Sequence, residues 1–190
     1  AGISSGRVSS TSDGIHSNSS KTLARSSFLL GDAEARITFI FIFLSKRGNF
    51  AMMIQFYEKL PEEAHFIRQT VFVEEQGFRE EFDTIDNTAV HAVVFADGSP
   101  IATGRIFPAE ENGAYYLGRL AVLKDFRRGG TGRKMLAFLE SEAAKRGASK
   151  IILHAQIQAQ PFYEKNGYIA EGEPFLEESA PHITMMKKLG

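Results

Sequence analysis

The fold of this chain is decided by one stretch, Arg119-Leu120-Ala121-Val122-Leu123-Lys124-Asp125-Phe126-Arg127-Arg128-Gly129-Gly130-Thr131-Gly132-Arg133-Lys134. A predicted strand over residues 114–123 enters a glycine-rich corner and continues as a helix. Glycines let the backbone turn tightly and approach a ligand without a Cβ in the way. The first N–H groups of a helix lack intrahelical partners and lie at the positive end of its dipole. The corner therefore predicts an anion site, to which Arg127, Arg128, Arg133 and Lys134 add positive charge.

Known phosphate loops do not match this corner. A P-loop requires Gly-Lys-Ser/Thr, whereas Gly132 is followed by Arg133-Lys134-Met135. A dinucleotide-binding fingerprint requires a third glycine where Met135 stands, and it also requires several further strand–helix units. At this point an ordinary capped helix after a glycine turn remains an open alternative.

The rest of the chain predicts a mixed α/β architecture with hairpins. Asp97-Gly98 between two apolar runs is a strong hairpin signal, and Pro61 with Glu62 and Glu63 predicts a helix start. We expect strands over 53–57, 89–96, 101–108, 114–123, 151–156, 167–170 and 183–188. We expect helices over 61–77, from Gly132 to Gly147, and over 159–165, with an acidic irregular loop over 78–88.

Composition excludes several classes of function. The 190 residues fit one domain plus a tail, and the net charge of −1 argues against a dedicated nucleic-acid binder. The absence of cysteine excludes a disulfide scaffold, a thiolate zinc site and a cysteine acyl intermediate. The longest apolar run, 37–44, is far shorter than the roughly 20 residues of a membrane span. No metal site is expected, and the expected location is the cytoplasm.

The first 51 residues differ from the rest in composition. They are rich in Ser and poor in acidic residues, and they show no hydrophobic periodicity before Ile37. Such a leader suits an organelle transit peptide, but it has no initiator Met and no clear amphipathic helix. We therefore expect residues 1–51 to be non-native sequence, with Met52-Met53 as the natural start and 52–190 as the domain. The apolar 37–44 stretch is expected to pack against another segment.

The glycine corner also resembles a family signature. Arg127-Arg128-Gly129-Gly130-Thr131-Gly132 matches the Arg/Gln-x-x-Gly-x-Gly/Ala motif of the GNAT N-acetyltransferases, and Leu120-Ala121-Val122 resembles the strand before it. The resemblance spans about residues 53–190. It implies the acyl-CoA N-acyltransferase fold, with a central, mixed, mostly antiparallel sheet flanked by helices. It also implies acetyl-CoA as cosubstrate, with the diphosphate on the amides of residues 128–133 and pantetheine beside Leu120 and Val122.

A second motif of the same family follows at the right separation. Gln156-Ile157-Gln158-Ala159-Gln160-Pro161-Phe162-Tyr163 with Gly167-Tyr168 matches the pattern Asn-x-x-Ala-x-x-Phe/Leu-Tyr-x-x-x-Gly-Phe/Tyr, except that Gln156 replaces Asn. The resemblance places Tyr163 where the family commonly carries the proton donor to the leaving thiolate. The cofactor-binding residues that it implies are Leu120, Ala121, Val122, Arg127, Arg128, Gly129, Gly130, Thr131, Gly132, Arg133, Gln156 and Phe162.

Without cysteine, the simplest chemistry is direct attack of an amine on the thioester carbonyl. By resemblance, the amide of Val122 is the oxyanion donor and Tyr163 the general acid; a half-buried packing tyrosine is the structural alternative. The general base is not fixed by the sequence, and water-mediated deprotonation is common in the family. Glu75 ranks first, before Glu74, Asp83, Asp86, His91 and His154.

A finer resemblance concerns the acceptor side. The stretches 68–76 and 175–185, with Asp83 and Asp86, resemble the bacterial ElaA/YjcF-like subgroup. This implies a small-molecule primary amine as acceptor, with Arg68, Asp86 and His182 as substrate-binding residues, although Arg68 equally suits internal scaffolding. The alternatives are an acyl-homoserine-lactone synthase and a silent CoA-binding or sensing module. By analogy with the fold class, a homodimer is one expected assembly.

Overall fold

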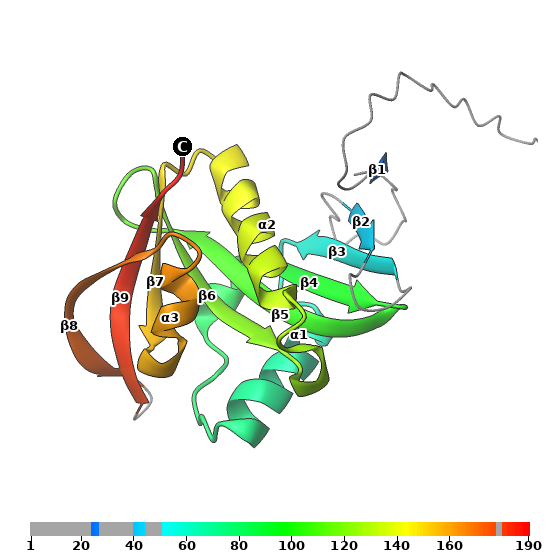
Figure 1. The fold of residues 1–190 in the computed structure, drawn as a ribbon, viewed down its shortest axis with the longest axis horizontal. Helices are drawn as coiled ribbons and strands as arrows, with labels where there is room; N and C mark the ends of the chain where they lie inside the picture. Colours follow the sequence, from blue (N-terminus) through cyan, green and yellow to red (C-terminus); the bar gives the residue numbers. More distant parts are fainter. Residues whose placement is uncertain (1–23, 27–39, 45–50, 178–179) are drawn as a thin grey trace, which may run out of the picture.

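The computed structural model describes residues 24–26, 40–44, 51–177 and 180–190, which form one sheet with helices on both faces (Figure 1). The strands are β1 Ala24–Ser26, β2 Ile40–Leu44, β3 Ala51–Tyr57, β4 Val90–Ala96, β5 Ser99–Pro108, β6 Ala114–Val122, β7 Lys150–Gln156, β8 Ile169–Glu177 and β9 Ala180–Lys188. The α-helices are α1 Glu62–Arg68, α2 Thr131–Lys145 and α3 Gln160–Glu164. A π-helix, η1 Gln69–Glu75, continues α1, and short 3₁₀ turns are η2 Thr84–Asn87, η3 Lys124–Phe126 and η4 Ile157–Ala159.

The sheet order is β1-β2-β3-β4-β5-β6-β7-β9-β8. Among the described strands, β6 and β7 form the parallel pair, and every other neighbouring pair is antiparallel. α2 connects these two parallel strands, as a crossover must. The prediction of a mixed, mostly antiparallel sheet is confirmed.

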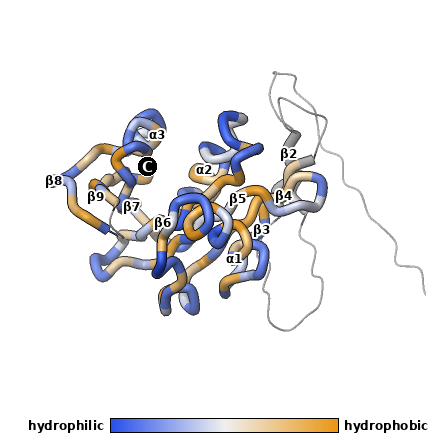
Figure 2. The backbone as a smooth tube through the Cα atoms, turned by 90° about the horizontal axis from the view of Figure 1, so that it is seen from below, coloured by the Kyte–Doolittle hydropathy of each residue, from blue (hydrophilic) through white to orange (hydrophobic). Residues whose placement is uncertain are grey.

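The core lies on both faces of the central strands. Alternate residues of β4 face opposite sides, so Ala92 and Val94 pack in the cluster under α2, whereas Val93 and Phe95 pack under α1. This two-sided burial explains why β4 is an unbroken apolar run. Figure 2 shows the same arrangement, with hydrophobic colour concentrated in the central strands between α1 and α2.

Most predicted elements agree with the structure, and two differ. The hairpin at Asp97-Gly98 is confirmed, with both residues at positive φ as a two-residue turn requires. The helix predicted to continue to Gly77 is α-helical only to Arg68 and then widens into η1. The strand predicted over 167–170 instead runs over β8. Gly172 and Pro174 lie at an irregularity in this edge strand, where such residues are tolerated.

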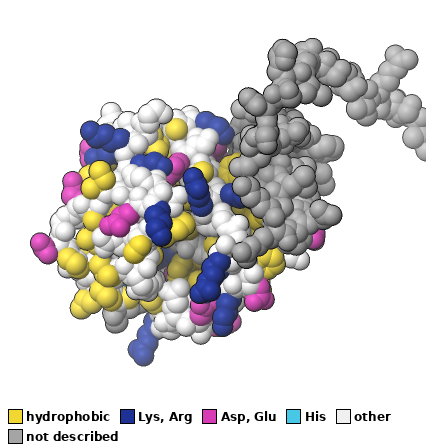
Figure 3. Space-filling view, viewed as in Figure 1, with side chains coloured by type: hydrophobic (Ala, Val, Ile, Leu, Met, Phe, Trp, Pro, Cys, Tyr) yellow, Lys and Arg dark blue, Asp and Glu magenta, His cyan; other side chains and the backbone are white. Residues whose placement is uncertain are grey.

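The N-terminal expectations fall largely outside the described residues. Residues 1–23, 27–39 and 45–50 are not described, so the proposed leader stays a prediction. Within the apolar 37–44 stretch, β2 pairs antiparallel with β3. In the described part of the chain, no helix has both the length and the apolar character needed to cross a membrane. On the face shown in Figure 3, basic and acidic side chains are interspersed.

Candidate active site

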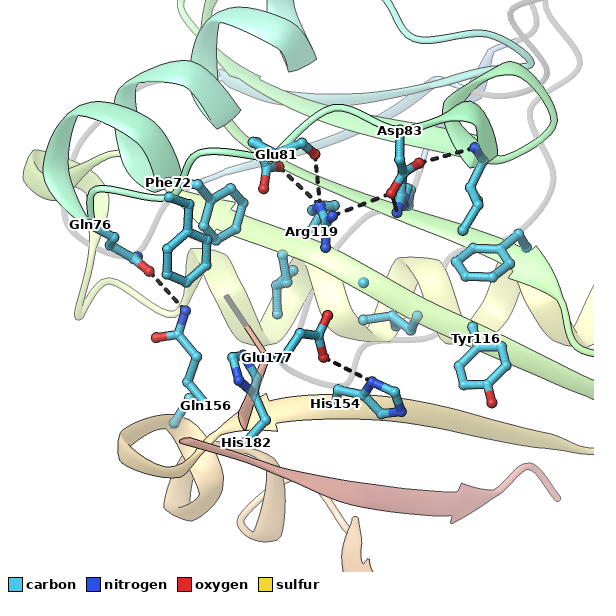
Figure 4. Close-up of a pocket in the computed structure, with 18 of the residues that line it drawn as sticks. Phe72, Gln76, Glu81, Asp83, Tyr116, Arg119, His154, Gln156, Glu177 and His182 are labelled. Atoms are coloured by element: carbon cyan, nitrogen blue, oxygen red, sulfur yellow. Dashed lines mark hydrogen bonds and ion pairs between the residues drawn. The ribbon is translucent and has the colours of Figure 1, made fainter. Parts of the chain in front are cut away.

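The site begins where β6 and β7 separate. The two strands pair only from Ala114–Lys150 to Tyr116–Ile152, although β6 continues to Val122 and β7 to Gln156. A cavity of about 500 Å³ opens at the diverging ends, which we call the wedge cavity. Its walls come from β5, β6, β7, the ends of β8 and β9, and the 78–88 loop (Figure 4).

A bulge in β6 shapes this cavity. Arg105 of β5 pairs with Gly118 and Thr103 pairs with Ala121, so β6 has one extra residue between these pairs. Arg119 lies in this bulge at a φ of 53°, a conformation that only local constraint holds in a non-glycine residue. Its side chain lines the wedge cavity.

The glycine corner lines a second cavity, of about 710 Å³, which we call the corner cavity. Gly130, at a φ of 83°, precedes the first residue of α2, and no side chain caps the helix. A Cβ built on Gly130 meets no atom within 4 Å, so the space over the corner is open. Arg128 and Arg133 line the same cavity. Free amides, a helix dipole and two cations suit a diphosphate, and the residues present therefore fit CoA.

The two cavities share one wall, formed by Gln76, Leu120, Ala159 and Tyr163. Gln156 Nε2 donates to Gln76 Oε1 at 2.8 Å and joins the end of β7 to the end of η1 (Figure 4). Tyr163 is 9% exposed, and burial raises the pKa of its phenol well above the usual value. The phenol is therefore protonated at neutral pH, which suits a proton donor.

A closed ring of alternating charges, the charge ring, lies at one wall of the wedge cavity, and four of its members line the cavity. Its six members are Arg68, Glu81, Arg119, Asp83, Arg105 and Asp86, and each contacts the next. The contacts from Arg68 to Glu81 and to Asp86 are 2.7 and 2.6 Å long, and Arg68 is 1% exposed. The ring has no net formal charge and fixes the 78–88 loop against β5 and β6.

The charge ring predicts that the stability of the fold depends on pH. Burial alone would raise the pKa of Asp86, but the hydrogen bonds and charges of Arg68 and Arg105 outweigh it and lower the pKa to about 2. A depressed native pKa adds stability above the unfolded value of 3.8, and this stability is lost as the pH falls toward 2. We expect the urea midpoint of the wild type to fall over this range, whereas Asp86→Asn, weaker at neutral pH, loses less on acidification. If the urea midpoint fell equally in the two proteins, the lowered pKa of Asp86 would be contradicted.

Most of the predicted cofactor residues lie together. Nine of them line the corner cavity together with Tyr163: Leu120, Ala121, Val122, Arg127, Arg128, Gly130, Gly132, Arg133 and Phe162. Gly129 lies in the turn before α2, and Thr131 is the first residue of α2. Gln156 and His182 line the wedge cavity.

Three predicted residues lie elsewhere. Arg68 and Asp86 line neither cavity; they are buried in the charge ring, behind the cavity wall. Glu75, the predicted base, also lines neither. Arg127 binds its carboxylate through both terminal nitrogens, at 2.6 and 2.7 Å, and this hydrogen bonding lowers the pKa of Glu75. Arg127 also donates to the Val122 carbonyl at 2.8 Å, so the ion pair fixes the loop after β6.

Sequence reasoning missed several residues of the wedge cavity, above all Arg105, Arg119, Tyr116 and Glu177. Arg119 stood next to the recognised Leu120-Ala121-Val122 stretch, but nothing in that stretch signalled the bulge that directs it into the cavity. Among the described residues, no group of three or more His, Asp or Glu side chains is arranged to hold a metal ion.

Comparison with known proteins identifies the family. The acetyltransferase (GNAT) domain matches residues 57–189. The chain belongs to the GNAT acetyltransferase family. YjcF of Bacillus subtilis, named an uncharacterised N-acetyltransferase, is 40% identical over 133 residues, which cover 68% of this chain and 94% of that protein.

Solved structures share the fold of this chain. Escherichia coli ElaA has a TM-score of 0.65 at 22% identity, covering 73% of this chain and 99% of that chain. An acyl-CoA N-acyltransferase from Pseudomonas aeruginosa has a TM-score of 0.63 at 24% identity, covering 73% of this chain and 99% of that chain. The predictions of the GNAT family, its ElaA/YjcF-like subgroup and its fold are confirmed.

Proposed function

We propose that this GNAT protein transfers the acetyl group of acetyl-CoA directly to a primary amine of a small molecule. The main support for this proposal is that the corner cavity and the wedge cavity meet at one wall, which contains Tyr163. The corner cavity has the amides and cations that suit a diphosphate. The wedge cavity has the volume and the polar groups that suit an acceptor. The thioester then lies at the shared wall, between the two.

The chain's own residues supply the remaining chemistry. Leu120 and Val122 lie at the end of β6 that does not pair with β7, so their backbone offers hydrogen-bond partners for the pantetheine arm. The same backbone offers a donor for the carbonyl oxygen that becomes negative during attack. Tyr163 gives its proton to the sulfur as the carbon–sulfur bond breaks. His182 and Gln156 lie at paired positions of β9 and β7 and border the acceptor.

The anion site is tested by Gly130→Glu. The new side chain places a carboxylate over the corner, and a residue with a Cβ is strained at a φ of 83°. We expect acetyl-CoA to raise the melting temperature of the wild type and to leave that of the variant unchanged. Gly98→Glu, at a comparable φ in the distant β4–β5 turn, is the matched control and should keep the ligand-induced shift. Equal shifts in Gly130→Glu and wild type would place the diphosphate elsewhere.

Turnover is tested by thiol release from acetyl-CoA with a panel of polyamines, amino sugars and amino acids. We expect release with at least one amine, and mass spectrometry should find one acetyl group on its nitrogen. Binding of acetyl-CoA without release by any amine would instead favour a CoA-sensing module.

A further inference from the structure

A histidine and a carboxylate face each other in the wedge cavity, apart from the charge ring. His154 Nδ1 lies 3.0 Å from Glu177 Oε2, and both side chains are 40% exposed (Figure 4). An ionised carboxylate only accepts hydrogen bonds, so in neutral His154 the proton resides on Nδ1. Nε2 then carries the lone pair, and no hydrogen bond to Nε2 forms within the described residues.

The other carboxylates and the other histidine of this cavity are less suited to take up a proton. Glu81 and Asp83 belong to the charge ring, and protonating either would leave buried guanidinium groups without a full counter-charge. His182 is also bound through Nδ1, at 2.9 Å, but its partner is the Ala180 backbone carbonyl and not a carboxylate, and the residue is only 6% exposed. Glu75 lies outside the cavity and is bound to Arg127. His154 is thus the accessible basic group with a carboxylate partner.

We infer that His154 is the general base that removes a proton from the acceptor ammonium, and that Glu177 is a positioning residue that holds the His154 ring in the Nδ1–H tautomer. This inference deepens the proposed function and rests on it.

The position of His154 on β7 suits this role. His154 and Gln156 lie two residues apart and face the same side of the strand, about 7 Å from each other along it. Gln156 reaches the shared wall through its bond to Gln76. An amine placed between the shared wall and His154 can pass its proton to Nε2 directly or through one water.

The protons balance. The ammonium loses two protons as its nitrogen bonds to the acetyl carbon and becomes an amide. One proton goes to His154 Nε2 before attack and then to solvent. The other is released when the intermediate collapses, and the sulfur that leaves takes up one proton from Tyr163. Solvent protons restore Tyr163, so the net products are the N-acetyl amine, CoA thiol and one proton.

Several groups surround the pair and set its electrostatics. Tyr116 of β6 and Phe175 of β8 contact the His154 ring edge-on, at 6.0 and 4.9 Å between centroids. The hydrogen bond from His154, with smaller contributions from the charges of His182 and Arg119, lowers the pKa of Glu177. Glu177 is therefore ionised at neutral pH and available as the acceptor for Nδ1–H.

The tautomer is tested without any acceptor or CoA. Long-range ¹H–¹⁵N spectra, with His154 assigned through His154→Gln, should show Nδ1–H in the wild type at a pH where the ring is neutral. Glu177→Ala should shift His154 toward Nε2–H, whereas Glu173→Ala, exposed on the same strand, should not. An Nε2–H tautomer in the wild type would overturn the inference.

Kinetics test the base itself. With the best amine of the panel, kcat/KM of the wild type should rise with pH through a limb that His154→Gln lacks, and the rate should fall by about 10²-fold or more. Glu177→Asp should keep more of the rate than Glu177→Ala. Acetyl-CoA should still shift the melting temperature of each variant, and His65→Gln, exposed on α1, should behave as wild type.

The outcomes separate the two proposals. A wild-type pH profile in His154→Gln overturns this inference and leaves the acetyltransferase proposal standing. The absence of thiol release with every amine overturns the proposed function, and this inference with it.

Discussion

Tyr163→Phe is expected to lower kcat by roughly 10²-fold or more, because the variant loses the phenol that protonates the leaving thiolate. Burial holds the pKa of this phenol above its usual value, so the proton is present throughout the neutral range. The ring itself stays, and with it the edge contacts to Phe162 and Tyr168, at 5.0 and 5.7 Å between centroids. Affinity for acetyl-CoA should therefore be nearly unchanged.

The measurement is single-turnover thiol release together with the melting shift that acetyl-CoA induces. Tyr115→Phe is the matched control, because Tyr115 lies on β6, is half-buried and lines neither cavity. If Tyr163→Phe and Tyr115→Phe release thiol at the same rate, Tyr163 is a packing residue and the thiolate leaves without its help.

Arg68→Met is expected to destabilise the protein by about 3–5 kcal/mol. The guanidinium donates to the Glu81 carboxylate and carbonyl and to both oxygens of Asp86. It also lies over the Phe82 ring, 4.8 Å from its centroid. Methionine fills a similar volume but leaves two buried carboxylates with less positive charge, and removing one partner of a buried ion pair is costly.

Urea unfolding measures this loss. Arg79→Met, exposed in the same loop, should leave the midpoint nearly unchanged. Arg68→Lys keeps the charge but not the forked geometry, so it should give an intermediate midpoint and remain measurable if the Met variant does not fold. A midpoint for Arg68→Met equal to that of Arg79→Met would show that the ring does not stabilise the fold.

The sequence was informative where function depends on short contiguous segments. The strand, glycine corner and helix from Arg119 to Lys134 are local, so residue order alone predicts both their shape and their anion preference. The same holds for the Asp97-Gly98 turn and for the segment that carries Tyr163. These stretches were enough to predict the family and the position of the corner cavity.

The wedge cavity was less predictable because its residues converge from distant positions. The charge ring joins α1, the 78–88 loop, β5 and β6, with partners up to 38 residues apart. His154 and Glu177 meet because β7 and β8 both flank β9, over a separation of 23 residues. No periodicity marks such pairs, so Arg68 and Asp86 were predicted to touch substrate although they lie behind the wall. Glu75 ranks first as base on the sequence alone. Its ion pair with Arg127 joins residues 52 positions apart, so the sequence does not show that this carboxylate is already paired.

The charge ring has a consequence for how acceptor preference can change. Arg68, Glu81, Asp83 and Asp86 place the 78–88 loop, whereas Phe78 and Ile85 of the same region contribute shape to the cavity surface. Glu81 and Asp83 also line the cavity, but Asp86 only anchors the segment, and Phe78 and Ile85 shape the cavity without belonging to the ring, so anchoring and selectivity are largely carried by different side chains. Substitutions at the second set can alter which molecules fit while the segment keeps its place, so new specificities are reachable without loss of the scaffold.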